Sequence, residues 1–176
     1  MQTAFRLSRQ QHAYADVLWQ DMLASYGDSE SPDYWRQRMQ RRAYQGAILA
    51  HLLKSAHSLS SAILKQLADT RFVDANKLDL VEIVPLLQQQ PFLSASAQLL
   101  LQAMQNGHIQ QILQAQQIFD GGVVSTQNQG SSSDLGQAIG LAANDNLDDP
   151  DRWPVGQWMR DLKDLQDTTQ AELLEF

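Results

Sequence analysis

Apolar residues recur at helical spacing wherever this chain shows a clear pattern, and this periodicity is its strongest constraint on the fold. In the first thirty residues the apolar positions follow the i, i+3, i+4, i+7, i+8 rule for one helical face: Ala15, Leu18, Trp19, Met22, Leu23 and Tyr26. Alternating, β-branched runs that would indicate strands are scarce. The pattern predicts an all-α protein, a single-domain bundle of about six or seven short-to-medium helices.

A second helix is expected to start at the sequence "SPDYW". Ser31 is suited to the N-cap, Pro32 to the first helical position and Asp33 to the positive end of the helix dipole. From residue 43 to residue 56 the sequence is apolar almost all round, which is typical of a buried central helix. A further helical piece is expected to run to about Thr70.

The remaining chain divides into shorter helices and two loops. Helices are expected near residues 78–90, limited by Pro85 and Pro91, and at 94–105 and 108–119, which complete a helical core over 1–119. Residues 120–133 are rich in Gly and Ser and predict a flexible loop. Residues 134–176 are expected to form an acidic end with a short helix, a loop and a terminal amphipathic helix.

Composition excludes several classes of protein. The 176 residues suit one domain spanning 1–176, and the absence of cysteine excludes disulfides, thiolate zinc sites and cysteine nucleophiles. The longest apolar run, "GAILAHLL", is far shorter than the roughly 20 residues of a membrane span. The first twelve residues lack the apolar core of a signal peptide. We therefore expect a cytoplasmic protein that does not contact a membrane.

A charge-free segment extends over Ile83–Phe119 and holds eleven glutamines among its 37 residues. Six of these glutamines repeat an i, i+4, i+7 spacing on two successive helices: Gln98, Gln102, Gln105, Gln110, Gln114 and Gln117. A neutral amide costs less to desolvate than a charge, so a glutamine face can be buried against a partner. These six positions are predicted as a partner-binding or self-association surface; a merely Gln-rich solvated surface is the alternative.

The acidic end carries an aromatic-led apolar stripe that includes Trp158 and Leu162. Trp is a favoured interface anchor, so both residues are also candidates for partner binding. A helix that closes the protein's own core would have the same pattern.

Basic residues gather on the second helix. Residues 34–68 contain six basic side chains and no acidic one, whereas residues 120–176 carry a net charge of −8. Arg38, Arg41 and Arg42 fall in one sector and could meet phosphates, which makes a nucleic-acid-associated protein the second hypothesis. Pairing with acidic residues of the same chain also explains them and ranks ahead of nucleic acid as the explanation.

Motifs for catalysis or cofactors are missing from the sequence. No two of the four histidines stand at i, i+4, the acidic loop lacks the pattern of an EF-hand, and "GSSSDLG" is neither a nucleophile elbow nor a phosphate loop. We expect no catalytic, cofactor or metal site. The function predicted is non-enzymatic protein–protein interaction, as an adaptor, chaperone or small subunit of a larger assembly.

Overall fold

The computed structural model describes residues 2–26, 34–67, 78–90, 92–121, 147 and 150–174. All regular elements in these ranges are helical, which confirms the all-α prediction. The helices are α1 (Gln2–Ser25), α2 (Tyr34–Leu67), α3 (Leu80–Gln88), α4 (Ala95–Asn106), α5 (His108–Phe119), the 3-10 turn η1 (Pro150–Arg152) and α7 (Val155–Leu174). The expected helix start at 31–33, the loop from 122 onward and the short helix at 134–143 lie outside the described residues.

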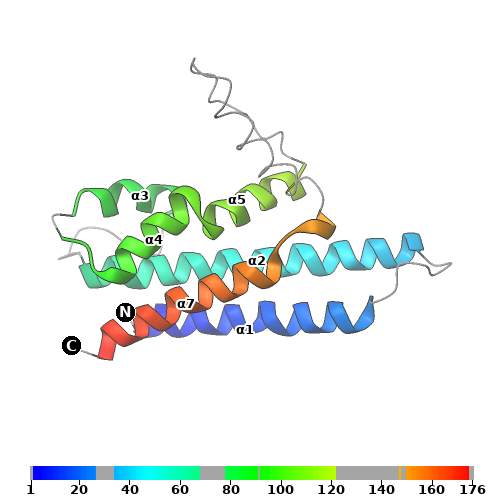
Figure 1. Ribbon diagram of the computed structural model, residues 1–176, viewed down its shortest axis with the longest axis horizontal. Helices are drawn as coiled ribbons and strands as arrows, with labels where there is room; N and C mark the ends of the chain where they lie inside the picture. The colour runs from blue at the N-terminus through cyan, green and yellow to red at the C-terminus, as the bar shows by residue number, and fades with distance from the viewer. Residues whose placement is uncertain are drawn as a thin grey trace, which may run out of the picture.

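The two longest helices, α1 and α2, run side by side and make the most extensive contact in the fold (Figure 1). Helix α7, drawn in orange and red, packs on this pair, and α3, α4 and α5 lie along α2 on its other flank. The start of α1 and the end of α7 are at the same end of the molecule. Helix α2 is therefore the central element, as its apolar sequence predicts.

Helix α2 is one uninterrupted helix of 34 residues. The sequence predicts a second helical piece that runs to about Thr70, but up to Leu67 these residues belong to α2 itself. The serine-rich stretch in its second half is buried, including Ser58, Ser60 and Ser61. Ser60 Oγ donates to the carbonyl of Ala56 at 2.8 Å, one turn earlier. Because the helix itself satisfies this hydroxyl, the serine does not end it.

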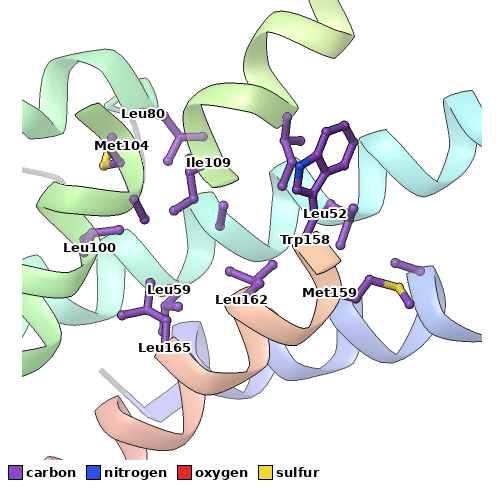
Figure 2. Close-up of a cluster of buried hydrophobic side chains, with 14 of the residues drawn as sticks. Leu52, Leu59, Leu80, Leu100, Met104, Ile109, Trp158, Met159, Leu162 and Leu165 are labelled. Atoms are coloured by element: carbon purple, nitrogen blue, oxygen red, sulfur yellow. The ribbon is translucent and has the colours of Figure 1, made fainter. Parts of the chain in front are cut away.

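The core lies between α2 and the five helices that pack on it (Figure 2). Each helix contributes the apolar positions that its periodicity places inward. Fully buried members include Leu52, Leu59, Ile83, Leu100, Ile109, Trp158 and Leu162. On α1 the predicted stripe is only partly buried: Ala15 and Met22 are inside, but Leu23, at the edge of the stripe, is 49% exposed.

A buried polar cluster joins α1, α2 and α7. The amide of Gln166 donates to Ser8 Oγ at 2.8 Å and to Ser55 Oγ at 3.1 Å, and Ser55 Oγ donates to the Ser8 carbonyl at 2.9 Å. A buried polar group is costly unless it is hydrogen-bonded, so sliding any of the three helices would break these bonds at a cost. The cluster therefore fixes the register of three elements that are distant in sequence.

Helix α3 contains Pro85 in its interior, contrary to the expectation that this proline limits the helix. The helix is short and ends soon afterwards at Gln88, and the Gln89 N–H donates to the Pro85 carbonyl at 3.2 Å. The proline thus removes one donor from a helix of nine residues without breaking it.

Candidate interaction surface

Helix α4 presents a continuous uncharged surface to solvent, which we call the α4 strip. Its N-terminus is fixed twice: Ser94 Oγ accepts the Ala97 N–H at 3.3 Å, and Glu172 of α7 accepts the Ser96 N–H at 2.9 Å. The inward face of the helix includes Leu100 and Met104. All residues of the α4 strip are exposed: Ala95, Gln98, Leu99, Gln102, Gln105 and Asn106.

The Glu172 carboxylate ties the two helices together electrostatically. Partial burial raises its pKa, but the hydrogen bonds from Ser96, together with those from Ser94 and Ala95, outweigh burial and leave the pKa below the ordinary value. The carboxylate is therefore ionised throughout the neutral range. Held against the α4 N-terminus, it complements the positive end of the helix dipole.

The glutamines of α5 are less uniform than the sequence predicts. Gln117 is exposed, but Gln110 and Gln114 are half-buried. Two other glutamines of this helix act within the protein: Gln111 Oε1 accepts the Trp158 indole N–H at 2.8 Å, and the Gln116 amide donates to Asp120 at 2.9 Å. The neutral surface is thus continuous on α4 and only partial on α5.

Trp158 and Leu162 lie inside the protein's own core, each with 0% exposure. Figure 2 shows both side chains directed from α7 toward the residues of α2. This corrects their assignment as partner-binding residues. An amphipathic helix that closes its own core and one that binds a partner have the same apolar stripe, and here the stripe is used internally.

The three arginines are not equivalent. Arg38 is exposed, while Arg41 and Arg42 are half-buried. Arg38 and Arg42, one turn apart on α2, line a hollow of about 430 Å³ with Met39 and Phe119. Arg41 is not among its lining residues. The hollow places two cations beside an aromatic ring at the end of α5.

A glycine allows α5 to approach α2 at this hollow. A Cβ atom at Gly46 would lie 2.7 Å from Cζ of Phe119, a distance that the ring could accept only by moving. Glycine in a helix interior costs about 1 kcal/mol relative to alanine. The close approach of the Phe119 ring gives this glycine a packing role.

A second hollow separates α4 from α7 beside the α4 strip. It has a volume of about 340 Å³, and Leu99 and Gln102 of the strip line it together with Ala103, His108, Asp161 and Leu165. His108 Nε2 is buried and makes no hydrogen bond within the described part of the chain. Burial lowers the pKa of His108, and the Asp161 carboxylate offsets this only in part. The imidazole is therefore held neutral at pH 7.

We expect the free energy of unfolding to fall as the pH drops below about 6.5, the ordinary histidine pKa. The folded pKa of His108 is lowered, so in this range the unfolded chain takes up a proton that the folded chain excludes. The pKa of His51 is also lowered, by burial and by Lys54. The His108→Asn variant should therefore reduce the slope of stability against pH between about 5 and 6.5 without removing it. Urea melts across this range would measure the slope, and an unchanged slope would contradict the assignment.

Surface residues that the sequence does not single out include several large apolar side chains. Phe92 is 87% exposed, Met39 73% and Val81 70%. Phe92 lies in the link between α3 and α4, where no periodic pattern predicts exposure. Met39 directly follows Arg38 on α2, and its exposure depends on how α2 packs against its neighbours.

Within the described ranges, no group of three or more His, Asp or Glu side chains is arranged to hold a metal ion. Of the helices described, α2 has the length and apolar composition of a membrane span, but 67% of that window is buried inside the fold. A core helix has the same composition, so this feature is weak evidence for a membrane. Comparisons with protein-family models, curated proteins and solved structures returned no match to this chain.

Proposed function

We propose that the protein is a non-enzymatic association module, an adaptor, chaperone or small subunit, whose docking surface is the α4 strip. The observation that carries the proposal is that all six residues of the strip are exposed and none is charged. An exposed helical face normally carries Lys and Glu, which keep it solvated. A face without charges is instead cheap to desolvate.

The energetic argument favours burial against a partner. A charge placed in an interface must be paired or costs several kcal/mol, whereas an amide needs only hydrogen bonds. Leu99, which is 43% exposed, adds an apolar contact in the middle of the strip. Gln117 of α5 is also exposed and uncharged, and Gln110 and Gln114 of the same helix contribute only their exposed parts.

The test adds one charge to the α4 strip and one to a matched position elsewhere. Gln98 is exposed near the start of α4, and Gln2 is exposed at the start of α1. Glutamate is compatible with the helix dipole at both positions, and the bond lost at Gln98, from its amide to the Leu93 carbonyl at 3.2 Å, is exposed to solvent. Gln98→Glu and Gln2→Glu should therefore leave the melting temperature close to wild type. Association should weaken in Gln98→Glu alone, because only there would the new charge have to be desolvated.

Two measurements read out association. Sedimentation over a range of concentrations reports self-association, and photocrosslinking from Gln102, compared with Gln2, reports contact with other proteins. If Gln98→Glu associates as strongly as Gln2→Glu and wild type, the α4 strip faces water and the proposal is wrong.

A nucleic-acid-associated role is the second candidate, and the hollow between Arg38, Arg42 and Phe119 favours it. Cations beside an aromatic ring suit the phosphates and bases of a single strand. It ranks second because two lining arginines on an acidic protein give weak, salt-dependent binding. Fluorescence anisotropy with a single-stranded oligonucleotide, for wild type and Arg42→Ala at two salt concentrations, would separate the candidates.

A further inference from the structure

The largest of the hollows described here is a groove formed by α1, α2, α3 and α5, which we call the α1/α3 groove. It has a volume of about 600 Å³, within the roughly 300–1,000 Å³ typical of small-molecule sites. Its lining combines apolar side chains with a few polar groups: Leu7, Gln11, Leu53, Lys54, His57, Ser58, Asp79, Leu80, Val81, Glu82 and Leu113.

Apolar side chains from all four helices face this groove. Leu7 of α1 is 44% exposed and Val81 of α3 is 70% exposed, while Leu53, Leu80 and Leu113 are wholly or partly buried beneath. A hydrocarbon chain that lies along these side chains would bury apolar surface of both the ligand and the protein. Each Å² of apolar surface buried stabilises the complex by about 25 cal/mol. The groove therefore suits a ligand with an aliphatic body.

Lys54 indicates which polar group the ligand carries. Its side chain is exposed at the groove, and its ammonium has no ion-pair partner among the described residues. The two carboxylates of the lining belong to the start of α3. There the two side chains form a capping box, in which Glu82 accepts the Asp79 N–H at 2.9 Å, and the positive end of the helix dipole, about half an elementary charge, offsets part of their negative charge.

The remaining titratable side chain of the groove, His57, already has a hydrogen-bond partner. Its Nε2 atom lies 2.7 Å from the carbonyl of Leu78, which can only accept, so Nε2 carries the proton and donates. Lys54 is thus the charged side chain of the groove that no partner among the described residues satisfies.

We propose that the α1/α3 groove binds an aliphatic monocarboxylic acid. The hydrocarbon chain lies on Leu7, Leu80 and Leu113, and the carboxylate accepts hydrogen bonds from the Lys54 ammonium. This site is separate from the α4 strip, none of whose residues lines the groove.

The experiment compares octanoate, octan-1-ol and octylamine, which share a chain and differ in charge. Binding would be followed by NMR titration of the methyl signals of Leu7, Val81 and Leu113. For wild type we expect saturable shifts with octanoate, weaker binding of octan-1-ol and the weakest binding of octylamine. A charge-assisted hydrogen bond in this setting corresponds to about a tenfold difference in affinity.

Two variants test whether Lys54 supplies the positive charge that binds the carboxylate. Lys54→Met keeps the length of the side chain and should weaken octanoate binding about tenfold while leaving octan-1-ol unchanged or tighter. Lys163→Met removes an exposed lysine of α7 that pairs with Asp167, and it should leave octanoate binding unchanged. Equal loss for both variants, equal affinity for acid and alcohol, tighter binding of the amine or absence of saturable shifts would each overturn the proposal.

Discussion

The Trp158→Ala variant is expected to lose about 3–5 kcal/mol of unfolding free energy, the range for truncating a buried Trp or Phe. The Trp158 side chain is fully buried, and its ring centroid lies 6.2 Å from that of Trp153. Truncation would leave a cavity where α7 meets α2 and α5, and Gln111 Oε1 would lose the indole N–H that it accepts at 2.8 Å. Urea denaturation followed by circular dichroism would measure the loss.

The Trp158→Phe variant separates packing from hydrogen bonding. It keeps an aromatic ring in the site and removes only the donor and part of the volume, so its loss should be clearly smaller than that of alanine. The exposed Leu174 of α7 provides a surface control, since Leu174→Ala should change stability by no more than about 0.5 kcal/mol. If Trp158→Ala also stayed within that limit, Trp158 would not be a core residue and its assignment as a partner anchor would return.

Helix positions are the part of the fold that the sequence predicts best. The residues of α5 match the predicted 108–119 and α4 differs by one residue at each end, because the N-cap serine and the glycine between these helices have clear local roles. The continuity of α2 could not be predicted, since it depends on serines that hydrogen-bond within the helix, such as Ser60. Propensity alone ranks serine below the best helix formers, because its hydroxyl can also bond to the backbone in caps and turns.

The spacing of apolar residues along the sequence does not reveal which helices pack against one another. Ser8, Ser55 and Gln166 are separated by 47 to 158 positions along the chain, yet their side chains form one buried cluster. Nothing in the local sequence around Ser8 distinguishes it from a surface serine. Its role follows only from the packing of α1 against α2 and α7.

The exposure of the candidate site was predictable from the sequence on α4 but not on α5. The spacing of Gln98, Gln102 and Gln105 correctly places them together on the exposed face of α4, because helical geometry alone decides this. The same spacing on α5 fails to predict that Gln110 and Gln114 are half-buried, since neighbouring elements decide their exposure. Whether the α4 strip binds a partner remains a prediction.

The Gly107→Ala variant should be destabilised by about 1–3 kcal/mol, the usual cost of forcing extra atoms into a filled site. Gly107 joins α4 to α5, and its φ of −116° with ψ of −159° is open to any residue, so backbone strain is not the reason. The reason is contact: an added Cβ would lie 2.7 Å from the Ala103 Cα and 3.2 Å from the carbonyl oxygens of Gln102 and Ala103. Backbone atoms cannot swing aside as a side chain can, so residue 107 would have to move away from the last turn of α4.

Gly156→Ala is the matched control, because it adds the same methyl group where there is room. A Cβ at Gly156 would meet Arg160 Nη1 at 3.7 Å and Trp19 Nε1 at 3.9 Å, which are ordinary contacts, and the position is in the first turn of α7. Alanine there should raise stability by up to about 1 kcal/mol, through helix propensity and a less flexible unfolded chain. Thermal melts of the two variants should therefore shift in opposite directions. A Gly107→Ala protein that melts at or above the wild-type temperature would show that the α4–α5 junction is looser than these distances require, and the geometry of the adjoining α4 strip would then have to be revised.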